Sequence, residues 1–329
     1  MWNSRVSLVV PGRNVADKLG ACLDAVVENL EDGLLDEIIL VDDGSTDATA
    51  ATAERYPVTV LTAGGIGPGG ARNLGWRATA GEIVWFIDAD CVAKPRALEI
   101  LLEHLGDPAV GGAGGTYANE VPSSLLGSLI HAEIVERHRR MPTKVGYLAT
   151  YNVCYRRSVL EALGGFDERL FNAPGKPGAE DIDFAYRACS AGWQLRFDPR
   201  SVVGHYHPTR LRSYLRTQRN HGFWRVALHL RHKRQGAGDD YSSVMDHAQP
   251  VVAVLAIAAT PLVAVGTLAS VPVVLWVVLL GLQLPMTLRI LSGAAGLRGL
   301  AYVPLGAIRA VWRGFGMTTA LLRHAVPGR

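Results

Sequence analysis

The sequence predicts an α/β domain followed by a hairpin of membrane helices, and three observations lead to this prediction. Short apolar runs alternate with stretches of helical spacing over roughly the first quarter of the chain, a pattern typical of a sheet covered by helices. Acidic side chains follow directly after two of these runs. From Pro250 to Leu284 the chain carries no charged residue, and this stretch is too long for one upright membrane span.

Four apolar runs predict buried strands, at Val6–Val10, Ile38–Val41, Val58–Leu61 and Ile83–Ile87. Apolar residues at helical spacing between these runs predict helices over 15–30 and 71–80. Because strands joined by helices usually run parallel, we expect a parallel sheet with helices on both faces. Right-handed crossovers then place the loops after Val10, Val41 and Ile87 along one edge of the sheet.

The middle of the chain is less regular. Helical spacing recurs over 98–105 and 123–140, and another helix is expected at Asp181–Ala191. The glycines of Gly111–Gly115 indicate a flexible segment or one that other groups approach closely. The Gly- and Pro-rich stretch Pro174–Gly178 stands just before the helix at Asp181, where a loop can close over a substrate.

Composition limits the class of protein. A chain of 329 residues suggests two domains, or one domain with an appendage. A net charge of +3 is too small to predict binding to nucleic acid. The four cysteines are far apart and form no CxxC pair, so we expect neither a disulfide framework nor a zinc site. The chain enters a strand almost at once, and we therefore expect no cleavable signal peptide.

The C-terminal region is predicted to lie in or on a membrane. One span needs about 20 apolar residues, so the uncharged stretch predicts two spans, at about 250–268 and 271–290. A soluble buried helix pair is the alternative, but such helices rarely stay apolar all round for this length. Residues 297–323 mix apolar side chains with arginines, which predicts an amphipathic helix at the interface or a third span with snorkelling arginines.

These observations define the expected organisation as an N-terminal domain at 1–232, a linker at 233–248 and a membrane region at 249–329. Basic residues flank the hairpin on both sides, and its internal turn carries none. Because positively charged flanks remain on the cytoplasmic side, we expect a protein of the cell (inner) membrane with its N-terminal domain in the cytoplasm.

Three acidic pairs mark the candidate site: Asp42 with Asp43, Asp88 with Asp90, and Glu180 with Asp181. Carboxylates at the C-terminal ends of strands project into the crevice where open α/β sheets bind ligands. Two carboxylates separated by one residue, as at 88 and 90, suit Mg²⁺ or Mn²⁺ bridging two phosphates. The sequence therefore predicts one site that binds a nucleotide, holds a divalent metal and removes a proton.

Each of these residues also has a structural interpretation. Asp43 can belong to a solvated Asp-Gly turn, and Glu180 and Asp181 can cap the helix that they open, where its dipole favours negative charge. Arg13 and Arg72 can pair with a diphosphate or lie at the surface. The Gly-rich loop 64–70 matches neither the dinucleotide fingerprint nor the P-loop, so we expect neither class.

Further candidates lie nearer the membrane region. His205, two positions before His207, can bind a metal or phosphate, or can be an ordinary loop residue. Gln218, Trp224 and Arg225 belong to a basic, aromatic stretch. Such a stretch can stack a sugar or hold an anionic lipid head group, or it can be a plain juxtamembrane helix.

Five segments, in this order, together resemble the family 2 glycosyltransferases of the GT-A fold. The resemblance covers about residues 5–225. In that family the donor is a nucleotide diphosphate sugar and the anomeric configuration is inverted. The matching segments are VSLVVPGRN, EIILVDDGSTD, GGARNLGWRATAGEIVWFIDADC, YNVCYRRSVLEALGGFDERL and EDIDFAYRACSAGW.

The resemblance implies a Rossmann-like GT-A domain that binds a nucleotide sugar. It places Pro11, Arg13 and Asp43 around the nucleotide, with Arg72 as a further candidate for the diphosphate. Asp88 would contact the ribose or the metal, and Asp90 would ligate the metal, with His205 as a further candidate ligand. Asp181 would be the catalytic base. Contacts to the acceptor or diphosphate are expected from Glu180, Gln218, Trp224 and Arg225.

One departure bears on the type of product. The Gln-x-x-Arg-Trp motif of processive synthases is absent, because Gln218 is followed by Arg219, Asn220, His221 and Gly222. This difference argues against processive polymerisation.

The sequence therefore predicts a membrane-bound, inverting glycosyltransferase with a divalent metal cofactor. Its acceptor is expected to be lipid-linked, either a polyprenyl phosphate or a growing glycan of the cell envelope, and membrane lipids are expected partners. Within this class, the alternative is a non-lipid acceptor with the helices serving only as an anchor. Two alternatives come from other classes: a nucleotidyltransferase, and a non-catalytic membrane scaffold with a relict fold.

Overall fold

The structure is a computed structural model that describes residues 4–169, 172–173, 176–233, 239–293 and 295–325. The chain divides into two compact units, and each is described by itself. Unit 1 consists of Met1–Glu120 and Met141–Tyr206, and unit 2 consists of Val121–Arg140 and His207–Arg329. Unit 2 thus includes segments that precede residue 232, the domain boundary expected from the sequence. Residues 234–238 of the expected linker lie outside the described residues.

The strands of unit 1 are β1 Val6–Gly12, β2 Glu37–Asp42, β3 Thr59–Thr62, β4 Ile83–Ile87, β5 Cys91–Ala93, β6 Val110–Asn119, β7 Lys144–Val145, β8 Asn152–Arg156 and β11 Gln194–His205. Among the described residues they form a single mixed sheet in the order β3-β2-β1-β4-β8-β6-β11-β5, with β7 pairing to β11. A separate small hairpin joins β9 (Asn172–Ala173) to β10 (Lys176–Pro177).

The parallel sheet predicted from four strands is one part of a larger, mixed sheet. Strands β1 to β4 are parallel to one another, as expected. Strand β8, however, runs antiparallel to both of its neighbours, β4 and β6, and β5 runs antiparallel to β11. The sequence could not show this because a continuous apolar run reports burial on both faces and carries no information about strand direction.

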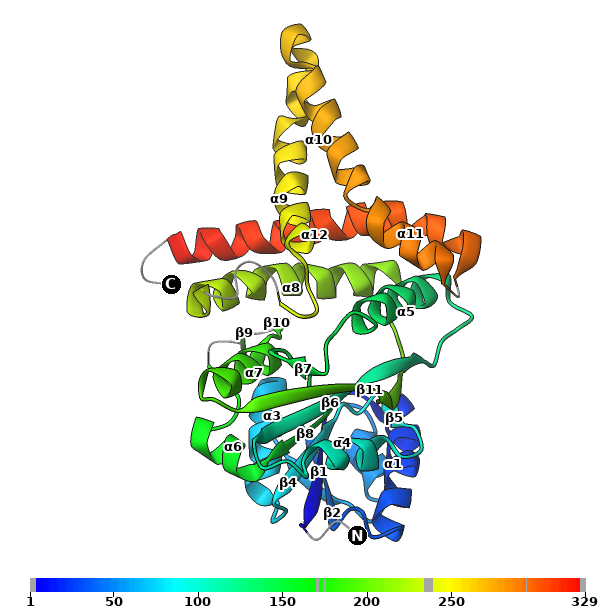
Figure 1. The fold of residues 1–329 in the computed structure, drawn as a ribbon, viewed down its shortest axis with the longest axis vertical. Helices are drawn as coiled ribbons and strands as arrows, with labels where there is room; N and C mark the ends of the chain where they lie inside the picture. The colour runs from blue at the N-terminus through cyan, green and yellow to red at the C-terminus, as the bar shows by residue number, and fades with distance from the viewer. Residues whose placement is uncertain (1–3, 170–171, 174–175, 234–238, 294, 326–329) are drawn as a thin grey trace. The chain divides into compact units, whose positions relative to one another are not determined.

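Helices cover both faces of the sheet, which confirms that part of the prediction (Figure 1). The helices of unit 1 are α1 Ala16–Glu31, α2 Thr49–Ala53, α3 Gly67–Ala78, α4 Ala97–His104, α6 Arg157–Leu163 and α7 Glu180–Ser190. Successive residues of a strand point to opposite faces. Leu8 therefore packs in the core with α1 and α4, whereas Val9 packs in a second core with α3 and α7.

The glycine-rich segment at 111–115 lies within β6, where neighbours do approach closely. A Cβ atom on Gly114 would come within 2.8 Å of Leu148, and a Cβ on Gly115 would overlap the carbonyl oxygen of Ser201. Glycine is required here because no larger residue fits between β6 and the groups around it.

Unit 2 is helical in its described part. Its helices are α5 Leu125–His138, α8 Leu211–Arg231, α9 Val244–Ala259, α10 Ser270–Gly281, α11 Leu284–Ser292 and α12 Tyr302–Ala325. Within this unit α9 and α10 lie side by side as a hairpin, and α12 crosses its foot alongside α8 (Figure 1). The break between the hairpin's arms consists of short 3₁₀ turns at Thr260–Ala264 and Gly266–Leu268. It therefore begins inside the first predicted span, 250–268, earlier than the sequence indicated.

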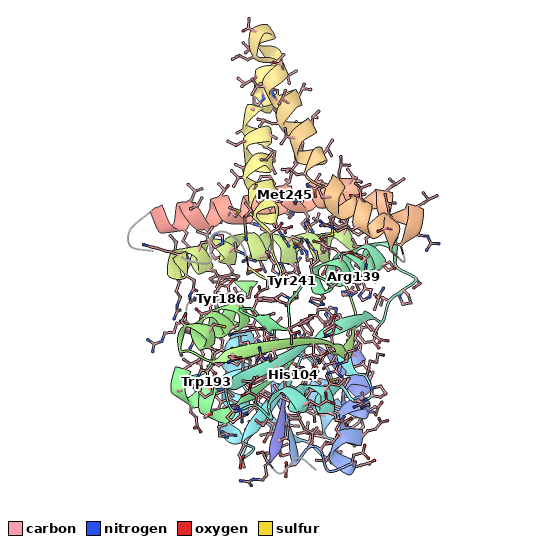
Figure 2. All side chains as sticks on the ribbon, viewed as in Figure 1. His104, Arg139, Tyr186, Trp193, Tyr241 and Met245 are labelled. Carbon is pink, nitrogen blue, oxygen red and sulfur yellow. The ribbon has the colours of Figure 1, made fainter. Side chains whose placement is uncertain are left out.

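The hairpin exposes an extensive apolar surface. Two helical segments, Val244–Ala264 and Gly266–Ser292, are long and apolar enough to cross a membrane by length and composition. Figure 2 shows side chains consisting mostly of carbon along both arms, with Met245 at the foot of α9. Large apolar side chains that are exposed include Val251, Leu255, Val263, Val273, Val274, Val277 and Leu280. An exposed patch of this kind marks a surface that contacts another apolar phase or partner.

Two arginines of α12 contact the protein instead of snorkelling toward water, whereas Arg323 is exposed. Arg309 is 2% exposed and forms an ion pair with Glu133 of α5, and Arg313 donates from Nε to Gln218 of α8 at 2.8 Å. The opposite face of α12 presents exposed apolar residues, among them Phe315. The helix is therefore amphipathic in an unusual sense, because its polar side faces the protein.

Candidate active site

The candidate site of unit 1 is built at the C-terminal ends of β1, β2 and β4. Strand β1 ends at Gly12, β2 ends at Asp42 and β4 ends one residue before Asp88. Residues Gly12 and Asp42 are directly paired across β1 and β2. The carboxylates that the sequence placed after separate strands therefore belong to one edge of the sheet, as the crossover argument predicted.

Asp43 organises the start of a helix. Its two carboxylate oxygens accept backbone N–H groups of Ile66 at 2.6 Å and of Gly67 at 2.8 Å. These amides open α3, and a carboxylate there satisfies donors that have no partner within the helix. This capping accounts for a helix that begins at Gly67 rather than near Ala71, where the apolar spacing predicted it. Asp43 thus ties the loop after β2 to the loop after β3.

Arg72 is the centre of a buried charge cluster. Its Nη2 donates to Asp88 Oδ1 at 2.7 Å, and its Nη1 donates to Glu180 Oε1, also at 2.7 Å. The side chains of Arg72 and Glu180 are 5% and 6% exposed, whereas that of Asp88 is 35% exposed and open to a ligand. Of the two interpretations of Arg72, a surface position is therefore excluded.

Asp181 follows Glu180 at the start of α7 and is only partly buried. Burial and the adjacent negative charge of Glu180 raise the pKa of Asp181 to about 7, against the opposing effects of Arg72 and of the backbone N–H of Ile182, which donates at 2.8 Å. A carboxyl group that titrates near neutral pH is suited to accept a proton during a reaction. Ala179, the residue before α7, has a positive φ of 73°, so the turn into this helix is strained.

Asp90 and His205 belong to a group of side chains that could hold a metal ion. Asp90 Oδ2 lies 3.6 Å from His205 Nε2, and the Asp90 side chain is 32% exposed. Cys91 lies in the same group of potential ligands, but burial raises the pKa of its thiol well above the usual range, so it remains a neutral, poor ligand. One carboxylate and one imidazole, beside the oxygens of Asp88, fit Mn²⁺ or Mg²⁺ better than a thiophilic ion.

The residues after β1 face the loop that precedes α3. Pro11 is the penultimate residue of β1 and pairs with Val41. Arg13 is exposed, and a Cβ atom added to Gly65 would lie 3.6 Å from its Nη1 atom. Asn14 adopts a positive φ of 54°, and its side-chain oxygen accepts the backbone N–H of Thr46 at 2.8 Å. These contacts hold the loops after β1 and β2 together around the exposed Arg13.

Three of the predicted contact residues belong to unit 2, and each has a partner inside that unit. Gln218 is buried and accepts from Arg313. Trp224 is buried and packs edge to face against Phe223 at 4.9 Å. Arg225 pairs with Asp239 at 3.1 Å. Their expected roles toward an acceptor or diphosphate remain predictions.

Two tyrosines near His205 were not identified from the sequence. Tyr117 of β6 stacks on Tyr151 at 3.6 Å between ring centroids, and it lies 4.7 Å from the His205 ring. Tyr151 donates its hydroxyl to the carbonyl of Gly115 at 2.7 Å. Isolated aromatic residues in apolar segments give no sequence signal of a site.

Pro174 and Gly175, part of the loop expected to close over a substrate, lie outside the described residues.

Comparison with known proteins agrees with this geometry. Residues 7–164 match the family model described as glycosyl transferase family 2. The chain is 30% identical over 242 residues to the pre-mycofactocin glycosyltransferase of Mycobacterium tuberculosis (strain CDC 1551 / Oshkosh), over 69% of this chain and 48% of that protein. It is 26% identical over 212 residues to the glycosyltransferase AglE of Haloferax volcanii, over 62% of this chain and 67% of that protein. The alignment thus spans about half the length of the mycobacterial relative.

A solved structure shares the fold. The mannosyltransferase PcManGT from Pyrobaculum calidifontis, in complex with GDP-Man and Mn²⁺, superposes with a TM-score of 0.64 over 98% of this chain and 88% of that chain. The two sequences are 19% identical, so this likeness concerns the fold alone. With the match of residues 7–164 to the family model, the chain belongs to glycosyl transferase family 2.

Proposed function

We propose that this chain transfers a sugar from a nucleotide diphosphate sugar to an acceptor, with inversion at the anomeric carbon. The observation that carries the proposal is the cluster around Arg72, which joins Asp88 to Glu180 beside an Asp181 whose pKa is raised to about 7. The family match supports the reaction class, and the GDP-Man bound by the Pyrobaculum neighbour supports the donor class.

Asp181 is proposed as the general base. It takes the proton from an acceptor hydroxyl while that oxygen forms a bond to the anomeric carbon. The bond from that carbon to the diphosphate breaks in the same displacement, and a nucleoside diphosphate leaves. Glu180 raises the basicity of Asp181, and Arg72 holds Glu180 and Asp88 in place, so that much of the catalysis is positioning.

The donor is proposed to lie along the edge formed by β1, β2 and β4. Pro11 and Asp43 would border the nucleotide, with Asp43 holding the loops rather than acting as a free acceptor. Exposed Arg13 is suited to the diphosphate, whereas Arg72 would act on the donor through Asp88. This assignment divides the predicted binding residues into those that touch the donor and those that shape its site.

Asp90, His205 and Asp88 would hold a divalent cation, Mn²⁺ or Mg²⁺. Such an ion, when bound, neutralises charge that builds on a leaving diphosphate. Asp90 and His205 present an oxygen and a nitrogen 3.6 Å apart, and burial raises the pKa of Asp90 in the free protein, although the neighbouring imidazole opposes this. The Mn²⁺ of the Pyrobaculum neighbour supports this choice of metal.

We further propose that the protein sits in the cell membrane and acts on a lipid-linked acceptor, a polyprenyl phosphate or a growing envelope glycan. The two apolar helical segments of unit 2, and the apolar outer face of α12, support association with a bilayer. The basic flanks of the hairpin favour a cytoplasmic site. In this proposed arrangement, α12 lies in the plane of the membrane–water interface rather than across the bilayer.

A donor and acceptor screen on the full-length protein tests the proposal. UDP-, GDP- and dTDP-sugars are incubated with Mn²⁺ or Mg²⁺, with and without polyprenyl phosphate, and release of nucleoside diphosphate is measured. We expect transfer from one donor, and we expect this transfer to require the metal. The Asp181→Asn variant should still bind that donor but should not transfer its sugar. Asp90→Ala should lose metal-dependent donor binding. Full turnover by Asp181→Asn would refute the mechanism, and transfer to water-soluble glycans alone would favour the anchor-only alternative.

A further inference from the structure

Charge is divided very unevenly between the two units. Unit 1 contains 16 lysines and arginines against 25 acidic residues, a net charge of −9, whereas unit 2 contains 17 against five, a net charge of +12. The chain's overall charge of +3 conceals this division. The sequence of unit 2 has no Asp or Glu over 207–238 or over 247–329. A surface this rich in one sign attracts polyanions or anionic surfaces.

Helix α8 concentrates part of this charge on one face. Arg212, Arg216 and Arg219 follow helical spacing and are all exposed. Within the described part of the chain, we find no carboxylate paired with any of the three. Two exposed arginines of unit 1 differ, since Arg96 pairs with Glu99 and Arg200 with Asp198, each at 2.7 Å. The charges of Arg212, Arg216 and Arg219 are therefore available to an external partner.

A groove of about 420 Å³ lies at Arg219, between α8 and α12. Gly316 allows the two helices to meet there, because a Cβ atom at that position would overlap the carbonyl oxygen of Arg219. The groove is lined by Arg219, Trp312, Phe315, Thr318, Thr319 and Leu322. It thus combines a cation and polar hydroxyls with an aromatic and aliphatic wall.

The composition of the groove indicates the kind of ligand. The hydroxyl of Thr319 already donates to the carbonyl of Phe315 at 2.7 Å, which leaves Arg219, Thr318 and the indole N–H of Trp312 as the lining groups that can donate to an anion. Phe315 and Leu322 are 43% and 64% exposed and continue the apolar outer face of α12. A nucleic acid or acidic peptide would leave this apolar wall in water, whereas a lipid would cover it.

We infer that this groove binds the head group of an anionic phospholipid. Arg219 contacts the phosphate, and Trp312, Phe315 and Leu322 pack against the glycerol and the upper part of an acyl chain. The apolar hairpin belongs to the same unit, and α12 crosses its foot, so the acyl chain of a lipid at this level would run alongside the hairpin (Figure 1). The site anchors the helices and is separate from the chemistry proposed for Asp181.

Native mass spectrometry of the full-length protein tests the inference. The protein is held in neutral detergent micelles that contain equal amounts of phosphatidylglycerol and phosphatidylcholine with identical chains, and the retained lipids are counted. One basic residue near an anionic lipid surface is worth about fivefold in affinity, so we expect about a fivefold preference for phosphatidylglycerol. Arg219→Gln should remove this preference.

Two matched variants separate the groove from general charge. Arg216→Gln removes a neighbouring charge on α8 that does not line the groove, and it should reduce the preference much less than Arg219→Gln. Arg55→Gln removes an exposed arginine of unit 1 and should leave the preference unchanged. Because all three side chains are exposed, none of the changes should alter folding, which the melting temperature verifies.

Three results would overturn the inference. The first is equal retention of both phospholipids by the unaltered protein. The second is an Arg219→Gln variant that keeps the preference, or an Arg55→Gln variant that loses as much. The third is retention of polyprenyl phosphate, added in a separate arm, when phosphatidylglycerol shows no preference. That last outcome would assign the groove to an acceptor and would leave the proposed glycosyl transfer intact.

Discussion

Arg72 donates to Glu180 across 2.7 Å, although the two residues are 108 positions apart in the chain and both are buried. The same guanidinium donates to Asp88, so one side chain sets the spacing between the end of β4 and the start of α7. A planar guanidinium can hold two carboxylates in fixed directions, which a lysine ammonium cannot do. The donor side and the base side of the proposed site are therefore positioned by the same residue.

Replacing Arg72 with lysine should destabilise unit 1 even though the charge is kept. Lysine cannot bridge Asp88 and Glu180 at once, and leaving a buried carboxylate without its partner costs about 3 kcal/mol. Denaturant unfolding followed by tryptophan fluorescence measures the change. Arg77→Lys is the control, because Arg77 on the same helix forms an exposed pair with Glu168 at 3.3 Å and should lose less than about 0.5 kcal/mol. Equal stabilities of the two variants would contradict the bridging role.

The pH dependence of transfer should report Asp181. The base must be ionised to act, so kcat/KM should fall as the pH drops below about 7, the pKa to which burial and Glu180 raise this carboxyl. Glu180→Gln removes a negative charge that raises this pKa, and the acidic limb should move to lower pH. The check is a pH profile of initial rates for both proteins. A limb that stays in place, or moves upward, would exclude Glu180 as the cause of the raised pKa.

The free energy of unfolding should also depend on the protonation of Asp181. The folded-state pKa of Asp181 lies above the unfolded value of about 3.9. The folded state therefore binds this proton more tightly, and the stabilisation is complete at low pH and is lost as the pH rises from about 4 to about 7. Asp181→Asn should remove this slope and raise the melting temperature at pH above 7, relative to the unaltered protein. If the melting temperatures of the two proteins change with pH in the same way between pH 4 and about 7, another group is responsible.

Asp43 should matter to the fold as well as to the donor. Asp43→Ala leaves the N–H groups of Ile66 and Gly67 without their acceptor, which costs about 1 to 2 kcal/mol as for other helix caps. Asp43→Asn keeps one acceptor oxygen and should lose less. Melting temperatures of the two variants measure the difference, and donor KM should rise in the same order. If alanine and asparagine are equally stable, the capping contacts contribute nothing.

A pair of glutamates on α5 offers a test of the charges in unit 2. Glu133 is shared by Arg137 and Arg309, all buried, so Glu133→Gln should cost about 3 to 5 kcal/mol. Glu136, three residues on, pairs with the exposed Arg139 at 3.2 Å, and Glu136→Gln should cost no more than about 1 kcal/mol. Thermal unfolding in detergent compares them, and similar losses would mean that Glu133 is not the buried anchor that its contacts suggest.

Much of the sheet could be predicted from local patterns. The run at Ile83–Ile87 has the bounds of β4, and the acidic residues after β2 and β4 do lie at one edge of the sheet. Strand direction could not be predicted, because β8 is as apolar and as buried as a parallel strand would be.

Ion pairs between residues far apart in the sequence could not be predicted either. Nothing in the segments around Arg72 or Glu180 indicates that the two meet. For 297–323 the sequence predicted an interfacial helix or a third span with snorkelling arginines, and neither alternative included a buried ion pair. Arg309 instead pairs with a glutamate 176 positions earlier. Sequence patterns identify charged residues in apolar segments, but only the packed chain shows whether water or a carboxylate neutralises them.

The separation of 176 positions between Glu133 and Arg309 imposes an order on biosynthesis. The last strand of the sheet, β11, ends at His205, so unit 1 can mature once this point has left the ribosome. Helix α5 is made earlier, yet Glu133 must wait for Arg309, about 100 residues after β11, which at about 5 to 20 residues per second is a delay of roughly 5 to 20 s. During that interval α5 exposes groups that native packing later hides, and a nascent chain interrupted after residue 232 would never bury them.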